Sequence, residues 1–270
     1  MNTVFPDRVP RLMRQNVLVI LLLATAARAA EPAKCVQDGI DVFPTPGAIV
    51  PTNVQLFLEG AGAEQERVSD LVGSSKLSLE AEGDSVPLKV ERGFVSTFRR
   101  VSVRLKPGHE LKPDKEYRLV LDRELSGAAI LNDVFGDHSI RWTTGPGPDK
   151  AAPKVTEKPA VSEGYYDKAK DGSLTRWLNF RAAVEDSSPV YVLVTMQRSR
   201  GSSVKQQYPV PLNGDTLRVG HDPCSGSFVF DDGRAYRLNF EVFDSAGNRF
   251  NQTSTLEVSA PRPPLAPPEK

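Results

Sequence analysis

Apolar residues alternate with polar ones in short runs from about residue 50 to residue 258. Such period-two alternation is typical of β-strands that bury one face, and turn residues such as Pro107-Gly108 and Gly136-Asp137 separate the runs. In the first half the runs are Val54–Leu58, Leu77–Leu79, Leu88–Val90, Val101–Leu105, Tyr117–Leu121 and Ile140–Trp142. One helical turn over residues 65–71 is the only helical segment that we expect. The pattern predicts a β-sandwich rather than alternating strands and helices.

The same alternation returns in the second half, after a segment that is unsuited to a sheet. Gly145-Pro146-Gly147-Pro148-Asp149 alternates glycine with proline, and proline lacks the N–H that a strand ladder needs. The later runs are Leu178–Val184, Val190–Met196, Leu217–Val219, Tyr236–Val242 and Leu256–Val258. We therefore predict one domain over residues 30–146, a second over 150–260, and an unpacked Pro-rich tail over 261–270. A Gly-Pro linker by itself leaves the angle between the domains free.

Two tyrosines stand in the same local pattern. Before each of Tyr117 and Tyr236, a large apolar residue lies six positions upstream, and a turn-forming pair lies four and three positions upstream. This spacing suits the tyrosine corner of Greek-key β-sandwiches, in which the phenol hydroxyl bonds to backbone a few residues upstream. Two copies predict an all-β fold of two tandem Ig-like Greek-key β-sandwiches. The apolar residues that follow each tyrosine are expected in separate cores.

The N-terminus has the three parts of a secretory signal peptide. Arginines precede an apolar run over residues 17–23, and the small residues Ala27 and Ala29 stand at positions −3 and −1 of a cleavage site before Ala30. The apolar stretch has roughly 12 residues, whereas a membrane-spanning helix needs about 20. We therefore predict a signal peptide over residues 1–29, with Met13 as an alternative start, and no membrane span after cleavage.

The charge of the chain gives no sign of a nucleic-acid or membrane partner. Removal of residues 1–29 takes four of the 34 basic and one of the 34 acidic residues, which leaves 30 against 33 and a net charge near −3. A weakly acidic surface of mixed charge lacks the basic patch that nucleic acids and anionic membranes require. We expect an exported protein, periplasmic or secreted, whose partner is an unknown protein or glycan of the envelope.

The chain has only two cysteines, Cys35 and Cys224. Export to an oxidising compartment favours a disulfide, and two cysteines are the minimum for one. Cys35 opens the first domain and Cys224 lies in the second, so a bond between them ties the domains together. Such a bond requires the domains to lie side by side, or an N-terminal segment that crosses over. Free or intermolecular thiols are the alternative.

Three segments of the first half resemble the bacterial Ig-like domains first described in surface-layer proteins. They are Pro46-Gly47-Ala48-Ile49-Val50-Pro51-Thr52-Asn53, then Leu111-Lys112-Pro113 with Tyr117, and then Trp142-Thr143-Thr144-Gly145. The resemblance covers about residues 40–146. In place of the family's usual Asp-x-x-Gly-Asn hairpin, this chain has the segment 132–137. The second half is similar to fibronectin type III or related Ig-like modules, through Tyr236 and the hairpin over 244–248. The resemblance implies a spacer, stalk or adhesion unit of an exported bacterial protein.

The sequence lacks the usual motifs of hydrolases, nucleotide-binding proteins and zinc enzymes. His109 and His138 stand beside turn residues, and we interpret all three histidines, His221 included, as loop residues. Cys224 follows His221 by three positions, but no oxyanion donor or third orienting residue can be identified with this pair. We therefore predict no catalytic residue and no cofactor.

Acidic residues of the second half fall at turns, where aspartate is favoured because it bonds its own backbone. Asp186 and the pair Asp231-Asp232 suit glycoside hydrolysis only if two carboxylates face each other across a sugar. Asp244 and Asn248, with Asp186 nearby, offer three side chains to Ca²⁺, which takes six or more oxygen ligands. We favour turn roles for all five residues and predict no metal.

Tyr165, Tyr166 and Trp177 are possible ligand-facing aromatics. Trp177 is out of phase with the inward residues Leu178 and Phe180, so we expect it to face outward at a strand start. Our interpretation is an exported, non-enzymatic Ig-like scaffold or binding protein. A carbohydrate-binding module, with these aromatics on one face, is the first alternative. An enzyme with titratable residues from both domains in one interdomain cleft is the second.

Overall fold

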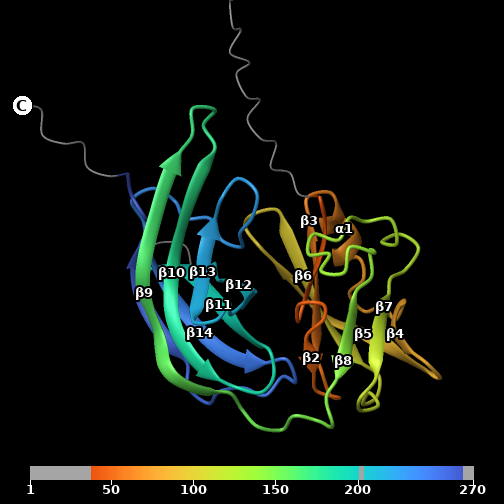
Figure 1. The fold of residues 1–270 in the computed structure, drawn as a ribbon. Coiled ribbons are helices and arrows are strands. Elements are labelled where there is room, and N and C mark those ends of the chain that lie inside the picture. Colours follow the sequence, from red (N-terminus) through yellow and green to blue (C-terminus); the bar gives the residue numbers. More distant parts are fainter. Residues whose placement is uncertain (1–37, 201–203, 264–270) are drawn as a thin grey trace, which may run out of the picture. The chain divides into compact units, whose positions relative to one another are not determined.

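The computed structural model describes residues 38–200 and 204–263. The predicted signal peptide, Cys35 and most of the Pro-rich tail lie outside the described residues, so the expectations placed on them stay predictions. In the described ranges the fold is all-β, with fifteen strands and one short helix, α1 (Glu64–Ser69), which lies where one helical turn is expected (Figure 1). That part of the chain contains no helix long and apolar enough to span a membrane.

The first eight strands form one hydrogen-bonded sheet in the order β1-β3-β6-β5-β4-β7-β8-β2. They are β1 (Gly39–Phe43), β2 (Ile49–Val50), β3 (Leu56–Ala61), β4 (Leu77–Ala81), β5 (Asp84–Val95), β6 (Arg100–Pro107), β7 (Glu116–Val120) and β8 (Arg141–Thr144). Strands β2 and β8 run parallel, and the other neighbours are antiparallel. The first part of β5 pairs with β4 and its last part with β6. Strand β5 therefore belongs to both layers of an Ig-like sandwich.

A register shift in β5 between Val90 and Arg92 follows Leu88, the residue that pairs with both β4 and β6. Such β-bulges bend a strand and increase its local twist. Both layers bury residues in one core, among them Leu56, Leu58, Leu79, Leu88, Val103, Leu119 and Trp142. The indole N–H of Trp142 donates to the carbonyl of Pro44 at 2.9 Å, so this large buried side chain leaves no polar atom unpaired.

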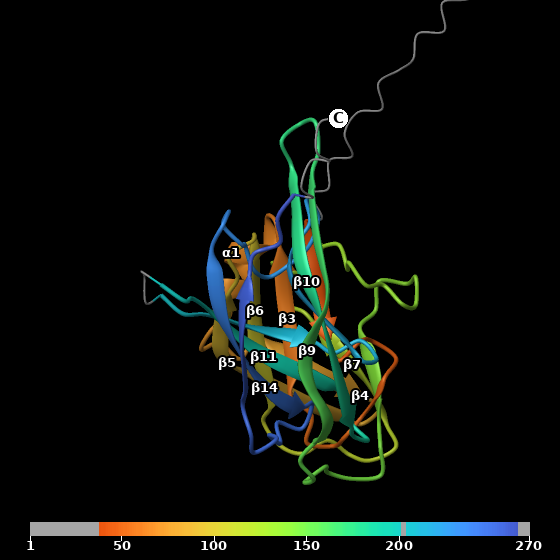
Figure 2. The same ribbon diagram turned by 90° about the vertical axis from the view of Figure 1, so that its left-hand side faces the viewer.

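The remaining strands form a second sandwich of two sheets. The strands are β9 (Lys154–Lys168), β10 (Leu174–Glu185), β11 (Val190–Arg198), β12 (Gln206–Pro211), β13 (Thr216–His221), β14 (Ala235–Asp244) and β15 (Ser254–Ser259). One sheet has the order β13-β10-β9 and the other β12-β11-β14-β15. This three-plus-four arrangement has the Ig and fibronectin type III architecture. Figure 2 shows the β9–β10 hairpin extending beyond the other strands.

Strands β9 and β12, like β1 and β2 of the first sandwich, have no counterpart among the predicted strands. Most side chains of β9 are exposed, and Pro159 together with three register shifts against β10 interrupts its ladder. Strand β12 carries Pro209 and Pro211 at the edge of its sheet. Edge strands often carry prolines, charges and bulges, which discourage pairing with another chain. Apolar alternation therefore overlooks four strands, β1, β2, β9 and β12, and each of them lies at the edge of a sheet.

The Gly-Pro linker is held by hydrogen bonds, which composition alone did not lead us to expect. The N–H of Thr52 donates to the carbonyl of Gly147 at 3.1 Å. Asn53 bonds the backbone of Asp149 twice: its Nδ2 donates to the carbonyl at 2.8 Å, and its Oδ1 accepts from the N–H at 2.9 Å. The first sandwich thus fixes the chain as it leaves β8, so the expectation of a free linker is corrected.

Candidate functional site

The two tyrosine corners bond to backbone in the same way. The hydroxyl of Tyr117 accepts from the N–H of Lys112 at 3.0 Å, and that of Tyr236 accepts from the N–H of Asp231 at 2.7 Å. Each phenol also donates to a carboxylate, Tyr117 to Asp84 and Tyr236 to Asp231. These donated bonds hold the pKa of Asp84 and of Asp231 below the usual aspartate value. Both corners therefore act in the architecture of the sandwiches.

Three carboxylates meet where the linker reaches the second sandwich. Asp149 lies in the linker, Asp186 between β10 and β11, and Asp244 at the end of β14, and their oxygens lie within 4.8 Å of one another. Asp186 and Asp244 are two of the three side chains considered from the sequence as Ca²⁺ ligands. The sequence carries no signal for Asp149, because only the folded linker brings that residue to them.

Neutral donors satisfy this acidic cluster. The Ser188 hydroxyl donates to Asp149 at 2.5 Å, and its N–H donates to Asp186 at 2.7 Å. The N–H and the Nδ2 of Asn248 each donate to Asp244 at 2.8 Å. Burial raises the pKa of Asp186 and of Asp244, and neighbouring carboxylates raise both further. Ca²⁺ takes six or more oxygens, so three carboxylates alone do not define a metal site.

Aromatic side chains join the outer face of the first sandwich to the second. Phe57 of β3 and Phe43 of β1 both pack edge-on against Tyr191 of β11, with ring centroids 4.8 and 5.7 Å apart. Phe243 of β14 stacks on Tyr191 at 5.3 Å. Phe57 and Phe94 of the first sandwich are buried within the core of the second. The apolar residues that follow the two tyrosines lie in separate cores as predicted, Leu119 in the first and Leu238 in the second, but phenylalanines of the first sandwich also pack against the second.

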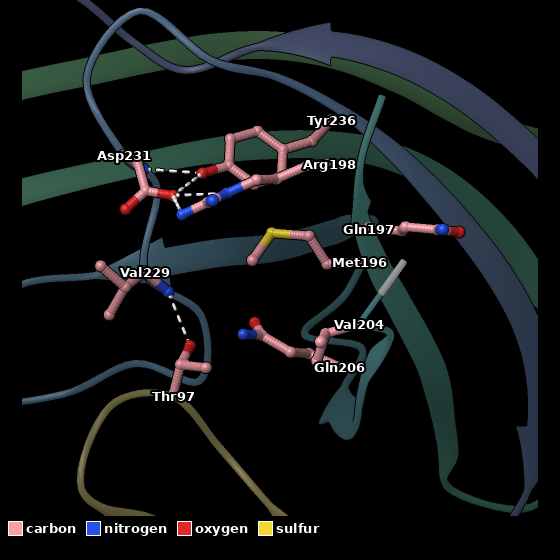
Figure 3. Close-up of a pocket in the computed structure, with 9 residues that line it drawn as sticks. All are labelled: Thr97, Met196, Gln197, Arg198, Val204, Gln206, Val229, Asp231 and Tyr236. Carbon is pink, nitrogen blue, oxygen red and sulfur yellow. Dashed lines mark hydrogen bonds and ion pairs between the residues drawn. The ribbon is translucent and has the colours of Figure 1, made fainter. Parts of the chain in front are cut away.

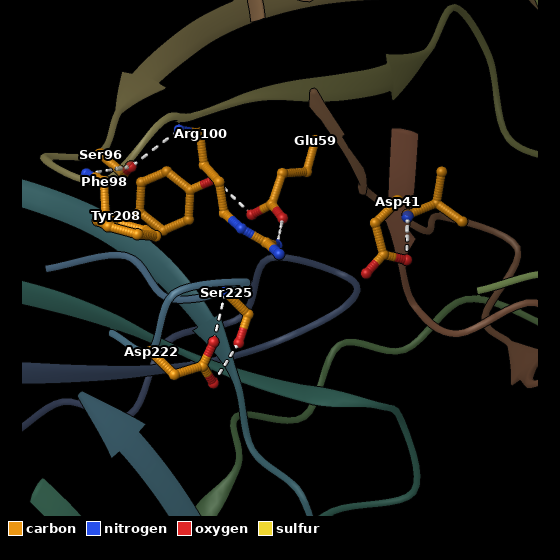
Figure 4. A network of polar contacts seen from close by, with 9 residues as sticks. Asp41, Glu59, Ser96, Phe98, Arg100, Tyr208, Asp222 and Ser225 are labelled. Carbon is orange, nitrogen blue, oxygen red and sulfur yellow. Dashed lines mark hydrogen bonds and ion pairs between the residues drawn. The ribbon is translucent and has the colours of Figure 1, made fainter. Parts of the chain in front are cut away.

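A buried ion pair joins β3 and β6, and its carboxylate lies two residues along β3 from Phe57 (Figure 4). Glu59 of β3 pairs with Arg100 of β6, and their side chains are only 17% and 14% exposed. The phenol of Tyr208, on β12, donates to the second oxygen of Glu59. Burial raises the pKa of Glu59, although Arg100 and Tyr208 both act to lower it. Because Tyr208 belongs to the second sandwich, this network joins the two domains.

His221 is not the loop residue that the sequence suggests. It ends β13 and is only 5% exposed. Phe98, from the turn between β5 and β6, packs on its ring with centroids 4.6 Å apart, and its Nδ1 lies 3.2 Å from the carbonyl oxygen of Phe228. Burial lowers the pKa of His221, which favours the neutral imidazole. His109 and His138 lie in loops of the first sandwich, as expected.

The loop after β13, which carries Cys224, contacts the first sandwich. The N–H of Thr97 donates to the carbonyl of Ser227 at 3.3 Å, and the N–H of Val229 donates to the Thr97 hydroxyl at 2.9 Å. These two hydrogen bonds of Thr97 thus join the two sandwiches near this loop. Cys35 lies outside the described residues, so its bond to Cys224 stays a prediction.

The three aromatics proposed to face a ligand lie on two faces of one sheet. Trp177 faces outward on β10, with Tyr165 of β9 stacked on its ring at 5.0 Å and the Arg218 guanidinium of β13 over it at 4.4 Å. Because β9 and β13 flank β10 on opposite sides, both faces of the Trp177 ring are covered. Tyr166 instead contacts the buried Arg176 at 4.8 Å. Tyr165, 41% exposed, is the most accessible of the three.

A cavity of about 290 Å³ opens beside the second tyrosine corner (Figure 3). Its walls include Met196, Val229, Gln206, Arg198, Asp231 and Tyr236. Arg198 donates to one oxygen of Asp231 at 3.0 and 2.6 Å, and Tyr236 donates to the same oxygen at 2.7 Å. The charges are therefore satisfied within the wall. No motif in the sequence points to this cavity.

Comparison with known proteins finds no matching family model and no matching curated protein. Among solved structures, the FN1–FN3 domains of chicken CNTN1 align with 82% of this chain and 64% of their own, at 13% identity and a TM-score of 0.26. Tandem Ig repeats of Dlar align with 83% and 95%, at 12% identity and a TM-score of 0.21. Pullulanase type I from Bacillus subtilis aligns with 82% of this chain but only 24% of its own, at 11% identity and a TM-score of 0.23. The chain thus spans about a quarter of that pullulanase.

Proposed function

We propose that this chain is an exported, non-enzymatic protein of two Ig-like modules, of the bacterial Ig-like and fibronectin type III kinds, that binds or scaffolds a partner in the envelope or outside the cell. The signal-like N-terminus supports export. The tyrosine corners and the strand order support the Ig-like modules. Ig-like folds serve many functions, so the proposal depends on how the modules are joined.

The joint between the modules is the observation that carries the proposal. Tyr191 is buried among phenylalanines of both sandwiches, and Tyr208 reaches the ion pair of Glu59 and Arg100. Contacts between domains of one chain are more often polar and allow relative motion, whereas a buried aromatic contact restricts it. Two modules held together in this way present their outer faces to a partner as one surface.

Export is tested by expressing the full chain in a bacterial host and separating the cell compartments. The proposal expects the protein in the periplasm or medium, with an intact mass that begins at Ala30. Protein retained in the cytoplasm with residues 1–29 attached contradicts it.

Binding is tested by incorporating a photo-crosslinking amino acid at exposed positions of the protein and irradiating the growing cells that express it. Tyr165 on the second sandwich and Ile49 and Val134 on the first are suitable positions. The proposal expects a discrete adduct from one face and none from the others. Uniform adducts, or none from any position, contradict a specific binding face.

The absence of catalysis is tested with the purified protein in a broad hydrolase panel. We expect no turnover above that of buffer. Turnover that is lost on mutation of His109, His138 or His221 overturns the non-enzymatic proposal.

The carbohydrate-binding alternative depends on the exposed ring of Tyr165. Affinity electrophoresis in gels that contain soluble polysaccharides provides the test, with Tyr165→Ala as the variant. Tyr166→Ala is the matched control, because Tyr166 contacts Arg176 on the opposite face. Retardation that disappears only in Tyr165→Ala favours the carbohydrate alternative over a protein partner.

A further inference from the structure

Another cavity, of about 530 Å³, opens where the sheet β12-β11-β14-β15 meets β5 of the first sandwich. We call it the polar cleft, because every side chain that lines it is polar or charged: Arg92, Thr195, Lys205, Gln207, Asn239, Glu241 and Thr253. Its volume lies within the range of ligand pockets. A wall without apolar side chains suits a ligand that forms hydrogen bonds over its whole surface.

Two cations of the polar cleft have no anionic partner. Among the described residues, neither Arg92 nor Lys205 takes part in an ion pair, and both are exposed. The Arg92 guanidinium donates to Oε1 of Gln207 at 2.7 Å and lies 4.7 Å from the ring centroid of Phe94, so two contacts hold it in place. A guanidinium has five N–H donors, so others remain for a ligand. Two uncompensated charges at the β12 end of the cleft favour an anionic group there.

The neutral side chains of the polar cleft already use their oxygens as acceptors. Gln207 accepts from Arg92, and Thr195 accepts from Nε2 of Gln207 at 3.1 Å. Asn239 accepts from the Thr255 hydroxyl at 2.8 Å, and its own Nδ2 donates to no atom of the described residues. That nitrogen retains solvent-exposed area, so a ligand can reach it. The cleft therefore has spare donors, which a ligand rich in oxygen acceptors satisfies.

The other end of the polar cleft contains a carboxylate. Glu241 of β14 lies across β11 from β12, and its Oε2 pairs with Arg249 at 3.3 Å. Within the described ranges its Oε1 accepts no hydrogen bond, and this atom is also open to solvent. A ligand hydroxyl can donate to Oε1, whereas a second anionic group is repelled there. The wall thus selects a ligand with an anionic group at one end and hydroxyls at the other.

We propose that the polar cleft binds an acidic sugar, whose carboxylate lies on Arg92 and Lys205. Its hydroxyl groups accept from Asn239 and donate to Glu241. A uronic acid has this combination, whereas a neutral sugar lacks the charge and an acidic peptide side chain lacks the hydroxyls. The site goes beyond the proposed function, which names neither a ligand nor a place for it. It also differs from the carbohydrate alternative, which places a sugar on Tyr165.

The test titrates the purified mature chain with D-glucuronate at low ionic strength and follows backbone amide NMR. A ligand of this size is expected to bind in the millimolar range at typical ligand efficiency. Saturable shifts are expected at Arg92, Gln207, Asn239 and Thr253. D-glucose lacks the carboxylate, and the α-amide of N-acetyl-L-glutamic acid has a carboxylate without hydroxyls. Each of these two probes is expected to bind at least tenfold more weakly than glucuronate.

Arg92→Gln and Lys205→Gln each remove one cation, so glucuronate binding should fall at least fivefold in each variant. Lys170→Gln is the matched control, because Lys170 is an exposed lysine between β9 and β10, outside the cleft, and it should bind like the wild type. Both cleft cations are exposed, so thermal unfolding should give wild-type Tm values.

Absence of saturable shifts overturns the proposal, as does equal binding of glucose or of the glutamic acid probe. Equal binding by Arg92→Gln or by Lys205→Gln also overturns it. Shifts confined to the surroundings of Tyr165 contradict it and favour the carbohydrate alternative. Export is measured separately, so a failure here leaves the proposed function standing, and the reverse also holds.

Discussion

Buried acidic groups lie at two places near the contact between the sandwiches, and the two places differ in what faces the carboxylates. Glu59 faces the Arg100 guanidinium and the Tyr208 phenol. The acidic cluster of Asp149, Asp186 and Asp244 is satisfied by hydroxyls, amides and backbone N–H groups. Burial raises the carboxylate pKa values at both places. The charge of Arg100 opposes this rise at Glu59, whereas neighbouring carboxylates add to it at Asp186 and Asp244.

This difference shows that a buried charge has to be judged together with its partners. Where a cation is present, removal of that cation leaves the carboxylate buried without a partner of opposite charge and destabilises the fold. Where only like charges and neutral donors are present, removal of one charge relieves repulsion. The two places should therefore respond to neutralising substitutions with opposite signs.

The largest effect is expected from Arg100→Met. The substitution leaves Glu59 buried without its cation, and breaking one side of a buried pair costs about 3 kcal/mol or more in the free energy of unfolding. Urea unfolding followed by fluorescence measures it, because Trp142 reports on the first sandwich and Trp177 on the second.

The double variant Glu59→Gln with Arg100→Met is the control for this prediction. It removes both charges, so it should recover a large part of the stability that the single variant loses. A single variant as stable as the wild type contradicts a structural role for the ion pair.

A smaller loss is expected from Tyr208→Phe, which removes the phenol that donates to Glu59. A hydrogen bond to a charged group contributes about 2 kcal/mol, so the free energy of unfolding should fall by about that amount. The pKa of Glu59 should also rise further, because the Tyr208 hydrogen bond acts to lower it. Carboxyl NMR titration measures this shift.

Tyr236→Phe is the matched control for Tyr208→Phe. Its phenol bonds Asp231 at the tyrosine corner and is not in contact with Glu59. Because Tyr236 also donates to a carboxylate, the variant should lose a similar amount of stability, about 2 kcal/mol, but leave the Glu59 titration unchanged. A shift of Glu59 in Tyr236→Phe would show that the titration does not report on the direct contact.

The sequence predicts the all-β fold and the tyrosine corners because both depend on local patterns. Strands that bury one face alternate, and Tyr117 and Tyr236 stand at fixed distances from their turns. Neither signal needs knowledge of distant contacts. The long exposed strand β9 buries almost no side chain, so its residues show no alternation to detect.

The contacts between the domains could not be predicted from the sequence. Glu59 and Tyr208 are 149 positions apart in the sequence. Phe57 stands between the inward residues Leu56 and Leu58, so the alternation predicts only that its side chain faces away from the first core. A large apolar residue on the outer phase of a strand is an available signal, but it does not name its partner. His221 is buried for the same reason, since Phe98 packs on its ring from the other domain, and the sequence does not show that contact.

A smaller effect, which depends on pH, is expected from His221. Burial lowers its pKa below the usual 6.5, Arg176 lowers it further, and Asp222 opposes them. The stability contributed by the neutral imidazole is complete above pH 6.5 and is lost as the pH falls through the folded pKa. Thermal unfolding between pH 7 and pH 5 measures this loss of stability on acidification. The loss should be smaller in His221→Gln than in the wild type, and the loop variant His109→Gln should show the same loss as the wild type.

The smallest effect is expected at the acidic cluster, and it has the opposite sign. Asp186→Asn keeps an oxygen to accept from the N–H of Ser188 and removes one of three neighbouring charges. We expect the free energy of unfolding at pH 7 to rise by about 0.5 kcal/mol.

The pH dependence separates repulsion within the cluster from a general effect of the substitution. The pKa of Asp186 and of Asp244 is raised above 3.8 in the folded protein, so the wild type loses stability as the pH rises from 3.8 through the folded values. The gain in Asp186→Asn should therefore disappear below that range. Asp171→Asn is the matched control, because Asp171 makes the same bond to a serine two residues on but has its pKa lowered by that serine, Ser173. Asp171→Asn should therefore lower the free energy of unfolding at pH 7. A higher free energy of unfolding in both variants would mean that repulsion among the three carboxylates is not the cause of the gain in Asp186→Asn.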